Sequence, residues 1–445
     1  MAVGPETVAA QLLDLQDQLA RSQRWSPEQM LEYQLRQLRL LTEHAHGTRP
    51  FYRARLEACG YRPGQEITLE FWRTLPILSR REVQDNFAAI TDGPIPAAHL
   101  PYSWDSTSGS SGMPLKIKKT RLERLMWLAA TLREELWHRR DVSAKLAVIR
   151  RAAANDAFPP EGKRMADWGP PVALVYHTGP AVLLDNRSST EQQAAWLLRE
   201  QPGYLLSFPS IIRELARYFR SEGLRLPSIR CMRTFGETVG PDVAPLCREV
   251  FGVEVVDVYS ASEIGYLALQ CPEHARYHVQ SEMMLVEVLD EAGRACAPGE
   301  VGSVVVTPFH NFAMPLLRYA IGDLAEVGAP CACGRTLPVL ARILGKARDL
   351  VVLPSGARRF VNLYPNTIAD LADLVQIQVA QKSLYDLEVR LVTRGVFGAA
   401  NEEKLRRLLN ENLGAHFRIA FDYRDAIARS PGGKYFDFVC EIPDR

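Results

Sequence analysis

Short apolar runs alternate with helical patterns between residues 146 and 259 of this 445-residue chain. Patterns at Thr190–Glu200 and Ser210–Ser221 have the apolar spacing of helices, and the runs between them are short enough to be buried strands. Strands that alternate with helices are typical of a largely parallel α/β sheet. The predicted strands are Leu146–Ile149, Ala173–Tyr176, Tyr204–Phe208, Ile229–Thr234 and Val253–Tyr259.

The segments on either side have a different character. The first hundred residues have the leucine spacing of helices, and a further helix is predicted over residues 121–140. Residues 283–328 instead predict a β-rich, more antiparallel layer, with strands at Met284–Leu289 and Ser303–Thr307 joined through turns at Gly293 and Pro298-Gly299.

The last hundred residues predict a compact α+β domain. Its helices are expected at Asn362–Leu371 and Asn401–Leu413, and its strands at Leu350–Leu353, Val375–Ala380, Leu387–Val392, Arg418–Tyr423 and Tyr435–Glu441. The charged stretch Lys346–Asp349 is the expected boundary. We therefore expect a large N-terminal domain over residues 1–345 and a small C-terminal domain over residues 346–445.

Composition excludes several classes of protein. The formal net charge of +1 provides no basic field for nucleic acid. No apolar run approaches the roughly 20 residues of a membrane span, and the N-terminus lacks the pattern of a signal peptide. Eight cysteines in so long a chain do not suggest a disulfide scaffold, so we expect a cytoplasmic protein. Whether it is a homodimer stays open.

A loop of small residues follows the first hundred. Glycine admits unusual backbone shapes, and hydroxyls and free N–H groups donate to anionic oxygens, so this loop is suited to a polyphosphate. It is not a Walker A loop, because no Gly-Lys-Ser/Thr ends it. A plain flexible loop is the alternative. Its residues are Ser106, Thr107, Ser108, Gly109, Ser110, Ser111 and Gly112.

Later motifs occur in a fixed order with this loop: Tyr259–Glu263, Leu317–Leu324, Arg342–Lys346 and Pro431–Lys434. The ordered set resembles the adenylate-forming ligase superfamily, and within it most closely the phenylacetate–CoA ligase family. The resemblance spans nearly the whole chain. It implies a large multi-subdomain adenylation domain with a small mobile C-terminal domain, and it implies ATP, Mg²⁺ and coenzyme A as partners of a small carboxylic acid, with an aromatic acid favoured.

The resemblance also assigns roles. Glu263 would bind Mg²⁺, a cation that prefers carboxylate and phosphate oxygens; capping of the next turn is the alternative. Asp323 would accept hydrogen bonds from both ribose hydroxyls, since one carboxylate can accept two hydrogen bonds. An Asx turn at Asp323 is the alternative. The other expected ATP-binding residues are Gly236, Glu237, Thr238, Asp257, Tyr259, Ser260, Ser262 and Arg342, of which Tyr259 could instead be a core residue. Ser260 and Ser262 depart from the family's glycine and threonine.

Lys434 ends a glycine-hinged loop near the C-terminus. In the family such a lysine stabilises charge at the acyl phosphate, a role that suits a compact ammonium on a long stem. The alternative is an ordinary surface lysine. The small domain of the family also rotates about a hinge, expected here at residues 345–349, where Arg348 replaces the usual acidic residue.

Cysteine and histidine residues suggest a second site, one that binds a metal ion. Cys331 and Cys333 lie in a tight turn, and Cys271 and His278 lie sixty residues earlier. Such ligands suit a closed tetrahedral zinc site, which some relatives in the family also have. His274 is the rival to His278, and four unlinked loop residues are the alternative. A zinc with four protein ligands would be structural.

We therefore expect an AMP-forming acid–thiol ligase that makes an acyl or aryl adenylate, releases pyrophosphate and then forms a thioester with coenzyme A. One alternative transfers the acyl group to a carrier-protein thiol or an amine. Another is a zinc-containing binding protein without catalysis, against which the retention of Glu263, Asp323 and Lys434 argues.

Overall fold

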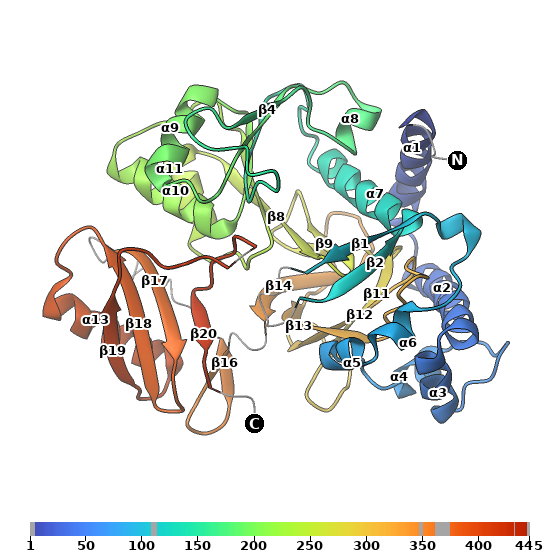
Figure 1. The fold of residues 1–445 in the computed structure, drawn as a ribbon. Coiled ribbons are helices and arrows are strands. Elements are labelled where there is room, and N and C mark those ends of the chain that lie inside the picture. The colour runs from blue at the N-terminus through green and yellow to red at the C-terminus, as the bar shows by residue number, and fades with distance from the viewer. Residues whose placement is uncertain (1–4, 108–113, 347–349, 361–373, 431, 443–445) are drawn as a thin grey trace. The chain divides into compact units, whose positions relative to one another are not determined.

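A computed structural model of the chain describes residues 5–107, 114–346, 350–360, 374–430 and 432–442 (Figure 1). Within these ranges the chain forms two compact units. The first contains residues 1–144, 166–180 and 257–343, and the second contains residues 145–165, 181–256 and 344–445. Both units are therefore assembled from separate stretches of sequence.

The first unit begins with the predicted helices. Ser26 caps one of them through a capping box with Gln29, and Thr120 caps another by accepting the N–H of Glu123. These helices are α1 (Pro5–Ser22), α2 (Pro27–Thr48), α3 (Pro50–Ala58), α4 (Leu69–Thr74), α5 (Arg80–Asp85), α6 (Phe87–Thr91), the 3₁₀ turn η1 (Ala97–His99) and α7 (Arg121–Trp137).

Strands of the first unit form the β-rich layer. The hairpin of β1 (Tyr102–Ser106) and β2 (Lys116–Thr120) carries the small-residue loop between its strands. The larger layer has the order β11-β12-β13-β14-β10-β9-β8. Its pairs β11–β12, β12–β13, β14–β10, β10–β9 and β9–β8 are antiparallel. Its strands are β8 (Glu254–Ala261), β9 (Gly265–Gln270), β10 (Tyr277–Val279), β11 (Met284–Leu289), β12 (Val301–Pro308), β13 (Tyr319–Val327) and β14 (Val339–Lys346).

The second unit contains the parallel sheet predicted from the alternating pattern. Its order is β7-β6-β3-β5-β4, parallel except for the edge strand β4. Its core is formed by apolar strand residues and by the helices shown in green in Figure 1. The elements are β3 (Leu146–Ile149), β4 (Lys163–Met165), β5 (Ala181–Leu184), α9 (Thr190–Glu200), β6 (Tyr204–Ser207), α10 (Pro209–Ser221), β7 (Cys231–Phe235) and α11 (Val243–Phe251).

One predicted strand is wrong. The run Ala173–Tyr176 is covered by the short helix α8 (Val172–Val175), and the strand of this region is β5. A short apolar run has no periodicity that separates a strand from a buried helical turn. Here Pro171 precedes the run, and its fixed φ suits the start of a helix.

The C-terminal residues form the predicted α+β fold inside the second unit. A sheet of order β19-β18-β17-β20 packs against α13, whose Leu405, Leu409 and Leu413 are fully buried (Figure 1). The elements are β15 (Leu350–Val352), β16 (Arg358–Phe360), β17 (Leu374–Gln381), β18 (Asp386–Thr393), α13 (Gly398–Leu413), β19 (Arg418–Tyr423) and β20 (Phe438–Cys440).

Two expectations about this region are not tested. The predicted helix Asn362–Leu371 and most of the predicted hinge, including Arg348, lie outside the described residues. The division at residue 345 stays a prediction.

Candidate functional site

The stem of the small-residue loop is closed by two hydrogen bonds. The N–H of Thr107 donates to the carbonyl of Leu115, and the N–H of Leu115 donates to Oγ1 of Thr107, each at 2.9 Å. Ser106 ends β1 directly before this closure. Ser108, Gly109, Ser110, Ser111 and Gly112 lie outside the described residues.

An arginine links this stem to the predicted metal-binding acid. Nη2 of Arg80 donates to Oγ1 of Thr107 at 2.8 Å, and Nη1 of Arg80 lies 3.6 Å from Oε1 of Glu263. Glu263 is only 7% exposed, so its carboxylate is largely removed from water. The structure therefore brings the loop stem and Glu263 together around one guanidinium.

Backbone hydrogen bonds explain the position of Arg80. Leu78 donates its N–H to the carbonyl of Arg318 at 2.8 Å and accepts the N–H of Ala320 at 2.9 Å, which attaches it beside β13. Ser79 then caps α5 through a capping box, so Arg80 is the first helical residue. Arg80 was not predicted from the sequence, because no motif distinguishes it among the 53 lysines and arginines of the chain.

The predicted ribose acid is held by a tyrosine. The hydroxyl of Tyr259 on β8 donates to Oδ2 of Asp323 on β13 at 2.8 Å. Burial raises the pKa of Tyr259 well above its usual value, and the charges of Asp323 and Glu263 raise it further. Tyr259 is therefore a neutral donor under the influence of both carboxylates. Its ring lies in the core of the unit, as the alternative interpretation expected.

The start of β13 is fixed by a buried ion pair. Arg318 donates from Nε and Nη2 to the carboxylate of Glu287 at 3.1 and 3.0 Å, and from Nη1 to the carbonyls of Arg73 and Leu75. Its backbone has a φ of +50°, a conformation that costs energy for a residue with a side chain. These contacts of Arg318 fix the backbone directly before β13, the strand on which Asp323 lies.

Other predicted ATP-binding residues of the first unit have protein partners. Asp257 accepts the hydroxyl of Tyr277 at 2.9 Å, and Nε of Arg342 donates to Oε2 of Glu326 at 2.6 Å. Ser260 lies on β8, and Ser262 is exposed in the turn before Glu263. Their roles toward a nucleotide stay predictions.

In the second unit, the structure brings Lys434 to the predicted Gly236 turn. A Cβ placed on Gly236 would lie 3.5 Å from Cε of Lys434 and 3.2 Å from the ring of Phe208. Gly236 has a φ of +77°, which suits glycine. The lysine stem therefore packs over the end of β7, where the resemblance implies ATP-binding residues.

The lysine loop needs a second glycine for a close contact. A Cβ on Gly433 would lie 2.2 Å from Nδ2 of Asn186, and the φ of Gly433 is +85°. Asn186 donates to the carbonyl of Gly433 at 3.3 Å. The backbone N–H of Lys434 donates to Oγ of Ser430 at 3.1 Å. These contacts hold the lysine in place.

Glu237 forms hydrogen bonds to the start of α10 and to the residue that follows Lys434. Its carboxylate accepts the N–H of Ser210 at 3.1 Å and the N–H of Tyr435 at 2.6 Å. Burial raises the pKa of Glu237, and the charge of Arg429 opposes that rise. A Cβ on Gly345 would lie 2.6 Å from Oγ1 of Thr238, so the predicted hinge also approaches this turn.

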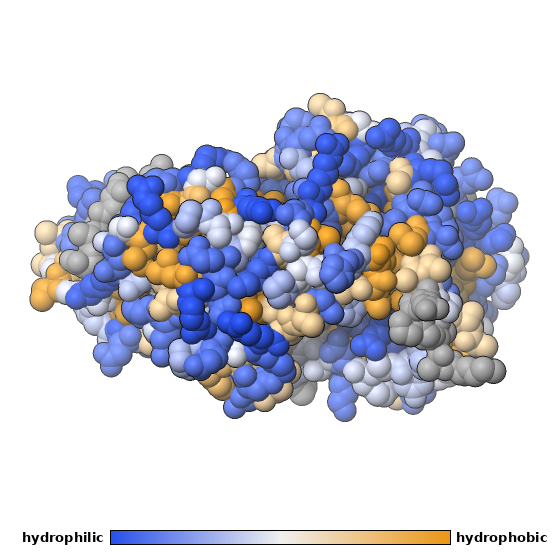
Figure 2. Space-filling model, turned by 90° about the horizontal axis from the view of Figure 1, so that it is seen from above, coloured by the Kyte–Doolittle hydropathy of each residue, from blue (hydrophilic) through white to orange (hydrophobic). Residues whose placement is uncertain are grey.

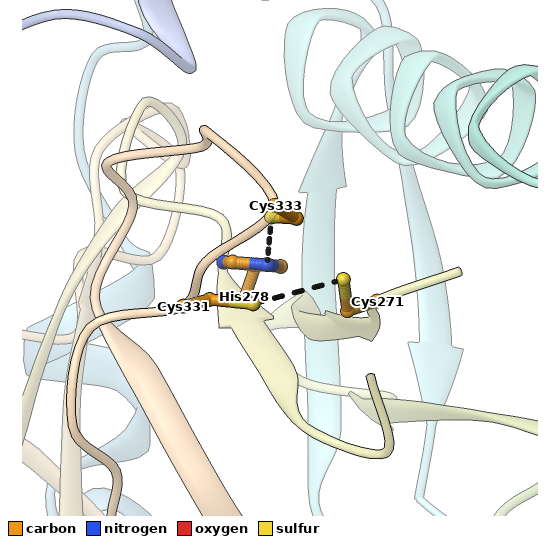
Figure 3. Close-up of side chains that lie close together, drawn as sticks. All are labelled: Cys271, His278, Cys331 and Cys333. Carbon is orange, nitrogen blue, oxygen red and sulfur yellow. Dashed lines mark hydrogen bonds between the residues drawn. The ribbon is translucent and has the colours of Figure 1, made fainter. Parts of the chain in front are cut away.

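A separate cluster in the first unit has the composition of a metal site (Figure 3). The ligand atoms of Cys271, His278, Cys331 and Cys333 all lie within 4.8 Å of one another. The hairpin of β9 and β10 supplies Cys271 and His278, and the loop before β14 supplies the other two thiols. Of the two candidate histidines, His274 is exposed and outside this group.

The distances fit a tetrahedral ion. Sγ of Cys331 lies 3.9 Å from Sγ of Cys271, and Sγ of Cys333 lies 3.2 Å from Nε2 of His278. Two thiolates bound to one tetrahedral zinc would be about 3.8 Å apart. Burial lowers the pKa of His278 to about 4, so its imidazole is neutral, as a metal ligand must be. The donor set therefore suits structural zinc.

Comparison with known sequences finds relatives that are named phenylacetate-coenzyme A ligase. No family model matches the chain. It is similar to the phenylacetate-coenzyme A ligase of Thermus thermophilus, with 23% identity over 92% of this chain and 95% of that protein. It is also similar to the enzyme of that name from Pseudomonas putida, with 22% identity over 87% of each.

Solved structures resemble the fold of the chain. A 2-hydroxyisobutyryl-CoA ligase in the postadenylation state aligns with a TM-score of 0.74 and 19% identity, over 95% of this chain and 92% of that one. The anthranilate CoA ligase AuaEII aligns with a TM-score of 0.54 and 15% identity, over 80% and 76%. The predicted fold class is confirmed: a mixed α/β protein with a smaller C-terminal sheet.

Among the described helices, each is too short or too polar to cross a bilayer. Hydrophilic residues cover most of the face shown in Figure 2, and apolar residues appear there in separate patches.

Proposed function

We propose that this chain, a member of the adenylate-forming ligase superfamily related to the phenylacetate–CoA ligases, activates a carboxylic acid with ATP and then makes its coenzyme A thioester. The observation that carries the proposal is the link from Thr107 through Arg80 to Glu263. It joins a loop suited to phosphates with a buried carboxylate suited to a hard cation.

In the first step a carboxylate oxygen of the acid attacks the α-phosphorus of ATP. A new P–O bond forms, the bond to the pyrophosphate oxygen breaks, and pyrophosphate leaves with the electron pair. Transfers of this type depend mostly on positioning and on stabilisation of charge. The loop after Thr107 would bind the β- and γ-phosphates, and Arg80 would supply positive charge at its stem.

Two carboxylates have different roles in this step. Asp323, held by Tyr259, would accept the ribose hydroxyls and fix the nucleoside. Glu263 would hold Mg²⁺, whose charge neutralises the polyphosphate. Nη1 of Arg80 lies 3.6 Å from Oε1 of Glu263, so Arg80 would add positive charge beside this carboxylate. The ribose and phosphate contacts stay proposals for these residues.

Lys434 would act at the acyl phosphate. Its compact ammonium can stabilise the negative charge that develops on the α-phosphate oxygens. The turn of Ser430 and Gly433 and the packing against Gly236 hold its stem in the second unit. We therefore propose Lys434 as the residue of the small C-terminal fold that is needed for adenylate formation.

In the second step a thiol sulfur attacks the acyl carbon of the adenylate. A C–S bond forms, the C–O bond to the phosphate breaks, AMP leaves with the electron pair of that bond, and the thiol proton is released to solvent. Coenzyme A is the acceptor that the relatives' names support. The comparisons do not favour the non-catalytic zinc protein. Transfer to a carrier-protein thiol or an amine is the remaining alternative, and a direct comparison of these acceptors tests it.

Finer features are also proposals. An aryl or arylacetic acid is the substrate class suggested by the relatives' names, and zinc bound by Cys271, His278, Cys331 and Cys333 would join the β9–β10 hairpin to the loop before β14. A cytoplasmic location and a homodimer stay predictions.

The test is acid-dependent exchange of labelled pyrophosphate into ATP across a panel of aromatic and aliphatic acids. We expect exchange that requires an acid and a divalent cation, followed by acid-dependent consumption of coenzyme A. Absence of exchange with every acid, from a folded protein, would contradict adenylation. Exchange without thioester formation, but with acylation of a carrier protein or an amine, would favour the alternative acceptor.

A further inference from the structure

A small cavity lies in the first unit beside Glu263. Its volume is about 20 Å³, enough for one water-sized group. Four segments form its walls: α7, the turn that directly follows Glu263, the start of β11 and the end of β12. Its lining includes Glu123, Trp127, Gly265, Tyr266, His310 and Asn311.

The cavity is mostly apolar. The rings of Trp127 and Tyr266 lie 5.0 Å apart, and methionine side chains complete this side. Gly265 has a φ of +113°, and a Cβ there would lie 3.8 Å from the ring of Trp127. Aromatic and thioether groups of this kind suit the apolar body of an organic acid.

Glu123 is the exception in this lining. It is 8% exposed, and its Oε2 has no hydrogen-bond partner among the described residues. Leaving such a buried polar atom unmatched costs free energy, so it normally has a partner. Its backbone N–H donates to Oγ1 of the cap residue Thr120, which fixes the residue at the third position of α7.

Asn311, another polar residue of the lining, already has protein partners. Oδ1 of Asn311 accepts the N–H groups of Ala313 and Met314, and its Nδ2 donates to the carbonyl of Lys118. Burial lowers the pKa of His310 to about 4, so His310 is neutral. Burial also raises the pKa of Glu123 to about 8, against the charge of Lys119, so its carboxyl is mostly protonated at neutral pH.

The location connects this cavity to the reaction, and this step rests on the proposed function. The acid must place its carboxylate at the α-phosphorus, near the metal that Glu263 would hold. Ile264 and Gly265 follow Glu263 directly and line the cavity. The body of the acid therefore extends from the reacting carboxylate toward this cavity.

We propose that the acid substrate carries a hydroxyl or neutral amino group, and that this group hydrogen-bonds to the carboxyl of Glu123. Glu123 is then a specificity-determining residue. The cavity has room for one such group, and the apolar walls would contact the rest of the acid. A site built around a buried polar group discriminates strongly against an analogue that lacks the matching group.

The experiment compares kcat/KM in pyrophosphate exchange for matched aromatic acids that are unsubstituted, hydroxyl-substituted or amino-substituted. For the wild type we expect a preference of roughly 10- to 100-fold for one or both substituted classes. The two substituted classes distinguish a hydroxyl from an amine. Equal kcat/KM for all three would overturn the proposal and leave a bound water as the partner of Glu123.

Variants separate recognition from folding. Glu123→Met removes the polar group and keeps a side chain of similar length. In this variant we expect kcat/KM for the substituted acids to fall by roughly 10- to 100-fold, while kcat/KM for the unsubstituted acid does not fall, so that the preference is lost. Glu123→Gln, which keeps hydrogen bonding, should retain the preference within about threefold. Glu32→Met is the matched control, because Glu32 is exposed on α2.

The outcomes also separate this proposal from the proposed function. If kcat/KM falls equally for all acids in Glu123→Met, or if the ratio of kcat/KM between the acids does not change, the role of Glu123 is overturned while adenylation stands. If Glu123→Met does not fold, loss of the preference in Glu123→Gln would equally contradict a role in hydrogen bonding. No exchange with any acid in the wild type would instead contradict adenylation itself.

Discussion

The hydroxyl of Tyr259 on β8 donates a 2.8 Å hydrogen bond to the carboxylate of Asp323 on β13, a residue 64 positions later in the sequence. Because Tyr259 is buried and its pKa is raised by burial, it stays a neutral donor at every physiological pH. Tyr259 therefore orients the carboxylate that we expect to bind ribose.

Replacement of this tyrosine should weaken nucleotide binding more than it changes chemistry. In Tyr259→Phe the ring stays in the core, but Asp323 loses a donor. We expect KM for ATP to rise by roughly 10-fold, because a hydrogen bond to a charged group contributes about 1.5–3 kcal/mol. Steady-state exchange kinetics measure this. An unchanged KM for ATP would show that Asp323 does not depend on the tyrosine.

Arg80 should matter for catalysis although no motif marks it. Arg80→Ala removes the link between Thr107 and Glu263, so we expect kcat/KM for ATP to fall by roughly 10- to 100-fold through lost charge stabilisation and positioning. Arg81→Ala is the matched control, since the Arg81 side chain is 90% exposed. Equal activity of the two variants would remove Arg80 from the mechanism.

Lys434→Ala should abolish pyrophosphate exchange and leave the fold intact. The side chain contributes a charge at the acyl phosphate, and its loop is held by backbone contacts that alanine keeps. Exchange rate and circular dichroism measure the two properties. Lys382→Ala is the control, because Lys382 pairs with Glu441 on the same small fold. Unchanged exchange in Lys434→Ala would exclude the lysine from adenylation.

The cysteine cluster predicts one zinc ion per chain by elemental analysis. Cys333→Ser, or treatment with a strong chelator, should lower Tm by roughly 5–10 °C, because metal-binding free energy contributes to folding. Cys59→Ser is the control, as Cys59 is a free thiol outside the cluster. Metal-free protein with unchanged Tm in Cys333→Ser would contradict a structural zinc site.

Glu123 predicts a pH dependence of stability. The pKa of Glu123 is about 8 in the folded protein, raised by burial, against an ordinary value of 4.5. Folding therefore binds a proton, so the stabilisation from this group is complete below pH 4.5 and is lost as the pH rises through 8. Relative to wild type, Glu123→Gln should become more stable between about pH 5 and pH 8 by a few kcal/mol, at about 1.4 kcal/mol per pH unit.

Denaturant titrations at both pH values measure this difference. Glu32→Gln serves as the control, since Glu32 is exposed. A constant difference in unfolding free energy between wild type and Glu123→Gln across this range would show that Glu123 is ionised in the folded protein.

Patterns of apolar residues along the chain predicted helices and strands well where the pattern was long enough to show a period. The boundaries of Thr190–Glu200 and Met284–Leu289 match α9 and β11. The run Ala173–Tyr176 failed, because four apolar residues fit a strand or a helical turn equally well and only the contacts of the folded chain decide between them.

The candidate residues divide in the same way. Residue types and order in the sequence identified Glu263, Asp323, Lys434 and the four-residue metal cluster as candidates, because each chemistry needs particular side chains at particular motifs. The names of the relatives agree with the superfamily and the kind of reaction that these motifs suggested. Individual roles at the nucleotide stay predictions.

Tertiary structure alone decided which partners these residues have. Arg80 contacts Glu263 because Leu78 pairs with residues 318 and 320, some 240 positions later, and His278 rather than His274 joins the thiols because β10 pairs with β14. Glu123 has an oxygen without a partner among the described residues, beside a cavity, because α7 packs next to the turn after Glu263. The residue types and their spacing in the sequence indicate which chemistry is possible. The distances between these side chains, and their removal from water, are set only when segments remote in sequence pack together.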